Sequence, residues 1–195
     1  MSSTIQSISR RLASEASYSG NVGRDAEVFA YAIKIALLNL TALGGIILIA
    51  WLLGTLKATL FLWTAAFSLR TFAGGRHSAD PITCWFLTVA VFTVLGYAIT
   101  IAGPLISEYV LLFIAFGLVF ALFTVITNAP VTIASKQFTY EKRRKMKMLS
   151  VAVVVFWAIV ALAPLQAVFD QPIMSLAITT GLVVQSISIM PLKGT

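Results

Sequence analysis

The chain has 195 residues, of which 59% are hydrophobic and only 11% are charged. Soluble domains carry roughly a quarter charged residues, because those residues cover their surface. This composition excludes an ordinary soluble globule and leaves too little polar sequence for a separate soluble enzyme domain. The mean hydropathy of +0.94 predicts an integral membrane protein whose surface is covered mostly by lipid.

The first segment, residues 1–25, is polar and lacks the apolar core of a cleaved secretory signal. Its apolar residues recur at helical spacing from Ile5 to Ala16, and Arg10 and Arg11 lie beside them. This pattern fits a short helix lying at the membrane interface. A solvated helix fits it as well.

Six apolar runs follow, each of about the length needed to cross a bilayer. Because lipid offers no partners for unpaired backbone groups, each run is expected to be a helix. Together they predict an all-α polytopic membrane protein that forms a single membrane-embedded domain over residues 1–195. The expected spans are 27–53, 56–73, 82–103, 108–127, 148–169 and 172–190.

The distribution of positive charge predicts the orientation of these spans. One side of the membrane holds twelve of the fourteen Lys and Arg residues, the other side holds only Lys57, and Lys34 lies inside the first span. Since the basic side is cytoplasmic, both termini are expected in the cytoplasm, and the net charge of +7 needs no nucleic acid to explain it. The second span is the least secure, because Lys57 and Arg70 lie near its ends. It could be a shallow or re-entrant segment.

The segment between the second and third spans has the residues needed for thiol chemistry. Gly74 and Gly75 give a turn the freedom to adopt unusual backbone angles, and His77 follows on the loop. Cys84 comes three residues after Pro81, in the expected first turn of the third helix. The N–H groups and the dipole at a helix N-terminus favour the thiolate, and a nearby histidine could take the thiol proton.

A structural interpretation of the same residues stays open, because free cysteines are commonly small buried hydrophobes. Cys84 is the only cysteine, so the chain forms no internal disulfide. One His and one Cys cannot complete a four-ligand metal site. We therefore expect neither a metal nor another cofactor.

The run of Arg70, Gly74, Gly75, His77 and Cys84, spaced R-x3-GG-x-H-x6-C, resembles the signature of the accessory gene regulator B (AgrB) family. These proteins are bacterial membrane endopeptidases of quorum sensing. The chain is also similar to them in length, in number of spans and in the place of the motif before the third span. Glu27, Tyr31 and Asn39 match a looser family pattern.

The resemblance implies a cysteine endopeptidase, or thiol protease, in the bacterial cytoplasmic membrane, with its active site facing the cytoplasm. The substrate would be a short propeptide with an amphipathic N-terminal helix and an acidic C-terminal tail. The enzyme would cleave off the tail, keep the signal portion as an acyl-thioester on Cys84, and promote its cyclisation to a thiolactone or lactone. A homodimer and a role in virulence regulation are also implied.

The roles of the motif residues follow from the same resemblance. Cys84 would be the nucleophile and His77 the general base. The Gly74–Gly75 pair would shape the loop, and Arg70 would be a carboxylate clamp or a structural anchor. Asp80 would either orient His77 or, as its place before Pro81 favours, cap the helix.

Other polar residues are candidate substrate contacts. Lys34 is costly inside a membrane unless it snorkels or pairs, so it, Glu27 and Asn39 could contact substrate or a neighbouring helix. A basic cluster in the expected loop between the fourth and fifth spans could set topology, attract anionic headgroups or dock the acidic tail. Its candidate residues are Lys142, Arg143, Arg144 and Lys145.

A small transporter or peptide exporter is the alternative from another functional class. Lys34, Asn39 and Gln166 would then line its path, and a non-catalytic scaffold is a third interpretation. An exporter would not need Cys84. A neighbouring short open reading frame that encodes an amphipathic helix and an acidic tail would favour the protease.

Overall fold

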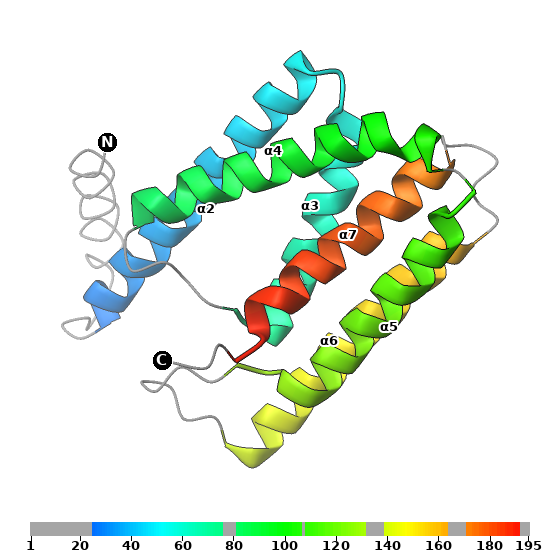
Figure 1. Ribbon diagram of the computed structural model, residues 1–195. Coiled ribbons are helices and arrows are strands. Elements are labelled where there is room, and N and C mark those ends of the chain that lie inside the picture. Colours follow the sequence, from blue (N-terminus) through cyan, green and yellow to red (C-terminus); the bar gives the residue numbers. More distant parts are fainter. Residues whose placement is uncertain (1–24, 76–80, 107, 132–138, 164–170, 192–195) are drawn as a thin grey trace. The chain divides into compact units, whose positions relative to one another are not determined.

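The computed structural model describes residues 25–75, 81–106, 108–131, 139–163 and 171–191 (Figure 1). All of the regular secondary structure in these ranges is helical, which confirms the all-α prediction. The helices are α2 (Asp25–Leu52), α3 (Leu56–Ala73), α4 (Pro81–Leu105), α5 (Val110–Asn128), α6 (Tyr140–Leu162) and α7 (Gln171–Ile189).

Five of these helices, all except α3, are long and apolar enough to cross a membrane. The protein is therefore a multi-pass membrane protein. The expected interfacial helix in residues 1–24 lies outside the described residues, and the orientation of the termini and the single domain stay predictions.

Helix α6 differs from its expected span of residues 148–169. It begins at Tyr140, so the basic cluster forms the first turns of the helix and does not lie in a loop. Its described part ends at Leu162. The cluster was placed in a loop because a membrane span was sought, and a helix can extend beyond the apolar core of the bilayer.

The chain divides into two compact units. The first contains Met1–Leu48 and Ser78–Val91. Within it, α2 approaches α4 at Gly45, where an added Cβ would lie 3.4 Å from both Trp85 and Val89. A glycine at this position lets the two helices pack closely.

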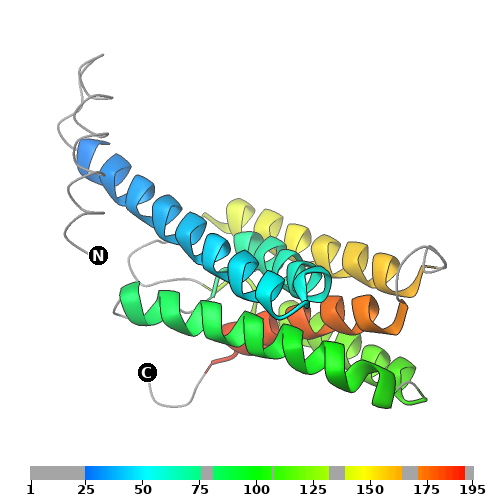
Figure 2. The ribbon, with the colours of Figure 1, turned by 90° about the horizontal axis from the view of Figure 1, so that it is seen from above.

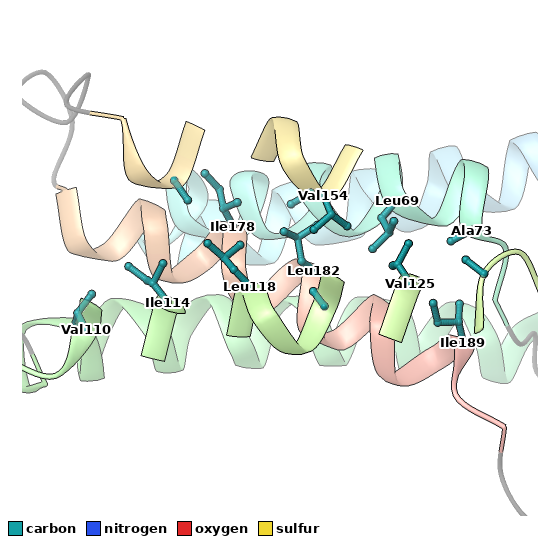
Figure 3. Packing of buried hydrophobic residues seen from close by; sticks show 14 residues of the cluster. Leu69, Ala73, Val110, Ile114, Leu118, Val125, Val154, Ile178, Leu182 and Ile189 are labelled. Carbon is teal, nitrogen blue, oxygen red and sulfur yellow. The ribbon is translucent and has the colours of Figure 1, made fainter. Parts of the chain in front are cut away.

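The second unit contains Ile49–His77 and Phe92–Thr195, and α7 is its central helix. Helix α7 packs against α3, α5 and α6. The ribbons of α5, α6 and α7 run alongside one another in both views (Figures 1 and 2). The buried apolar residues of these four helices form one cluster, in which Leu182 of α7 lies among residues of its neighbours (Figure 3).

Helix α3 is held by α7 and α6 although it is the least apolar candidate for a span. Gly181 of α7 packs against the carbonyl oxygen of Leu62 so closely that a Cβ would collide with it. On the side of α6, the indole N–H of Trp157 donates a 2.8 Å hydrogen bond to Ser68. Small residues and hydrogen bonds of this kind are what hold helices together in lipid.

Candidate functional site

Cys84 lies in the first turn of α4, three residues after Pro81, with its side chain partly buried. The Thr88 hydroxyl donates a 2.7 Å hydrogen bond to the Cys84 carbonyl oxygen one turn earlier in the helix axis. The neighbouring Trp85 meets Phe86 edge to face, with ring centroids 4.9 Å apart. The structure thus places the thiol at the N-terminal turn of a membrane-spanning helix, as the sequence predicts.

His77 and Asp80 lie outside the described residues, as do Arg76, Ser78 and Ala79. The pairing of His77 with Cys84 and the orienting or capping role of Asp80 therefore stay predictions. The described residues on the α3 side of this segment end at Gly75.

Helix α3 ends in a turn that requires glycine. Gly74 has a φ of +74°, and its N–H donates a 3.0 Å hydrogen bond to the Arg70 carbonyl oxygen. Residues with a Cβ rarely adopt such a positive φ. Gly75 is buried, and an added Cβ would lie 3.0 Å from the Ser188 hydroxyl oxygen and 3.1 Å from Gln185 Nε2. Both glycines of the motif thus have a structural reason.

The last turns of α7 hold this double-glycine turn in place. Gln185 is only 3% exposed, and its Nε2 donates a 2.7 Å hydrogen bond to the Gly74 carbonyl oxygen. Ser188 closes over Gly75 from the same helix and donates to the Gln185 carbonyl oxygen. We refer to the arrangement of Gln185 and Ser188 around Gly74 and Gly75 as the glycine clasp.

The chain after α5 braces the end of α3 from a second direction. The Val131 N–H donates a 3.0 Å hydrogen bond to the carbonyl oxygen of Ala73, the last residue of α3. Ala73 lies at the same end of the buried cluster as Ile189 of α7 (Figure 3). The residues immediately before the His77 segment are therefore fixed by two separate parts of the second unit.

Arg70 lies one turn before the clasp and is half-buried. Its guanidinium carbon is 3.9 Å from the position of a Cβ on Gly75. The structure thus places Arg70 beside the double-glycine turn, as the motif predicts. Its role as a carboxylate clamp or an anchor stays a prediction.

The basic cluster occupies the exposed first turns of α6. Arg144 and Lys145 line a surface hollow of about 550 Å3. The hollow also has an acidic residue and an apolar side, because it follows one face of the helix over successive turns. The full lining is Tyr140, Glu141, Arg144, Lys145, Met148, Leu149 and Ala152. Lys142 and Arg143 are exposed on the same turns.

The candidate substrate contacts of the first span lie in α2. Asn39 is exposed on this helix. Glu27 and Lys34 also belong to α2, but their side chains lie outside the described part of the structure. Gln166, a candidate for the lining of a transport path, lies outside it too. The transporter alternative therefore gains no support from these positions.

Sequence reasoning missed Gln185 and Ser188. A signal for Gln185 was available, because a glutamine inside an apolar run is costly in lipid and commonly faces the interior of a helical bundle. What the glutamine contacts could not be read from the sequence, since it depends on the packing of α7 against the end of α3.

The comparisons with known proteins give one match. The family model described as Accessory gene regulator B matches residues 5–189, which is nearly the whole chain and includes both His77 and Cys84. No curated protein and no solved structure matches the chain.

Proposed function

The chain belongs to the accessory gene regulator B family, and on this premise we propose that it is a membrane cysteine endopeptidase that processes a short autoinducer propeptide. The observation that carries the proposal is the place of its single thiol. Cys84 stands in the first turn of a membrane-spanning helix, where backbone N–H groups point toward an attacking thiolate and a developing oxyanion.

In the proposed reaction, His77 takes the thiol proton and Cys84 attacks the peptide carbonyl before the C-terminal tail. The C–N bond breaks, and the protonated His77 returns its proton to the leaving amine. The signal portion stays on Cys84 as a thioester. A cysteine or serine of the peptide then attacks the same carbonyl, which releases a thiolactone or lactone and regenerates Cys84.

Ring closure by thiol exchange is close to neutral in energy, because one thioester replaces another. It must compete with hydrolysis of the acyl-enzyme, and exclusion of water favours it. The attacking group is on the same peptide, so its high effective concentration favours it as well. A site at the boundary of the bilayer serves both requirements, and the charge distribution of the chain places it on the cytoplasmic side.

We propose that the acidic tail of the propeptide docks at the basic first turns of α6. Arg144 and Lys145 line the hollow there, and its apolar side at Met148 and Leu149 would accept the less polar part of the peptide. Reversing one charge with Arg144→Glu should raise KM severalfold and leave kcat near wild type, measured on the propeptide in proteoliposomes. An unchanged KM at low ionic strength would contradict this docking site.

The proposed chemistry is tested by expressing the full chain together with a short reading frame found beside its gene. Cys84→Ala and His77→Ala should each abolish cleavage while membrane insertion stays normal, because each removes one member of the proposed pair. Mass spectrometry of the protein should detect the signal portion as a thioester on Cys84. Cleavage at the wild-type rate by either variant would contradict the mechanism, and peptide export that survives Cys84→Ala would favour a transporter.

A further inference from the structure

We propose that Gln185 is a positioning residue, which directs the segment carrying His77 by holding the double-glycine turn. The inference rests on the proposed function, because it assigns Gln185 a part in the action of His77. Gln185 acts through the backbone of Gly74 and does not itself touch the reacting atoms.

The contacts of Gln185 are specific to the turn. Its Nε2 is 2.7 Å from the Gly74 carbonyl oxygen and 3.1 Å from the place where Gly75 would carry a Cβ. Carbonyl groups at the C-terminal end of a helix have no partner within the helix and need a donor from elsewhere. A buried amide that supplies this donor fixes the orientation of the peptide unit after α3.

Two adjacent glycines would otherwise leave the direction of the chain undetermined, because glycine has more backbone freedom than any other residue. His77 is only two residues beyond Gly75. The chain can carry its Cα no more than about 7 Å from that of Gly75. The direction imposed at the clasp therefore limits the region that the imidazole reaches.

The packing of α7 on α3 does not depend on this hydrogen bond. Gly181 meets the backbone of α3 at Leu62, and Leu182 is fully buried in the main cluster. The adjacent Ser186 is also fully buried, yet its hydroxyl has no hydrogen-bond partner among the described residues. Gln185 thus differs from its neighbour in having a defined partner at the motif, and Ser186 provides a matched control on the same helix.

The first test uses the single cysteine of the chain. His77→Cys adds a second one, and oxidation with copper phenanthroline in native membranes measures how readily the side chain at position 77 meets Cys84. A disulfide forms only when the two Cα atoms come within about 7 Å. Adding Gln185→Met, which keeps the size of the side chain and removes the donor, should slow crosslinking about fivefold or more, because the turn loses its brace. Adding Ser186→Ala should leave the rate unchanged.

The outcomes separate this inference from the proposed function. No crosslink in His77→Cys alone would overturn both, because the two side chains would then not meet. Equal crosslinking with and without Gln185→Met would overturn the positioning role and leave the proposed pair intact. Should Gln185→Met accumulate poorly, Gly75→Ala disturbs the clasp from the other side, since its Cβ would lie 3.0 Å from the Ser188 hydroxyl oxygen, and it should slow crosslinking likewise.

Cleavage kinetics give the second readout, with a synthetic propeptide of the sequence encoded beside the gene as the probe. In the otherwise native chain, Gln185→Met should lower kcat about 10- to 100-fold, since small misplacements of a catalytic group have effects of this size. KM should change less than about twofold. Loss of activity in His77→Ala but full kcat in Gln185→Met would overturn the positioning role alone.

Discussion

Helices α7 and α5 both have the length and composition of membrane spans, yet they have opposite surroundings. In the apolar stretch of α7, 56% of the residues are buried inside the protein, compared with 33% in α5. Helix α7 contains four buried polar residues, namely Ser175, Thr179, Gln185 and Ser186. Helix α5 instead exposes a row of large apolar side chains, which includes Phe116, Val119 and Phe123.

The difference shows how a membrane protein divides its sequence between packing and solvation. The polar groups of α7 are directed at other helices, as when the Ser175 hydroxyl donates a 2.7 Å hydrogen bond to the Ala161 carbonyl oxygen of α6. The exposed face of α5 offers lipid only apolar atoms. The helix that braces the proposed site is thus the one that could least be surrounded by lipid, because unpaired polar groups there are costly.

A charge on the exposed face of α5 is the strongest way to break this comparison. Val119 is near the middle of α5 and is 66% exposed. Val119→Asp should destabilise the inserted protein by about 3 kcal/mol, the cost of an acidic residue at the centre of a membrane helix. The measurement is the fraction of chains integrated into microsomal membranes.

Val119→Leu is the matched control, since it keeps the position apolar and should integrate at the wild-type level. If Val119→Asp integrated normally, α5 would not face lipid at this position. The assignment of its exposed side chains to the bilayer would then be wrong.

Most of the fold could be predicted from the sequence, because lipid permits only helices for a chain with these apolar runs. The ends of α3 and the start of α4 at Pro81 agree with the punctuation by glycine and proline. The start of α6 did not follow from hydropathy, since Lys142 and its basic neighbours end an apolar run without ending a helix.

The candidate site was predictable in its residues and not in its supports. The spacing of Arg70, His77 and Cys84 marks a motif, because these side chains are unusual near the ends of apolar runs. The bond from Gln185 to Gly74 joins residues 111 positions apart in the chain. Only the packing of α7 along α3 brings them together, and no local pattern encodes it.

The close packing of α7 on α3 can be tested with a smaller change, Gly181→Ala. The new Cβ would collide with the carbonyl oxygen of Leu62 and lie 3.3 Å from the Ala65 Cβ. Overpacking of this kind costs about 1–3 kcal/mol, whereas the higher helix propensity of alanine returns at most about 1 kcal/mol. The unfolding temperature in detergent should therefore fall.

Gly44→Ala in α2 provides the control, because nothing lies within 4 Å of its added Cβ. Only the gain in helix propensity remains there, so the unfolding temperature should stay the same or rise. An equal rise in both variants would mean that α7 does not press on α3 at Gly181. The clasp at the end of the same helix pair would then lose its rigid support, because Gln185 reaches Gly74 only while α7 holds its place along α3.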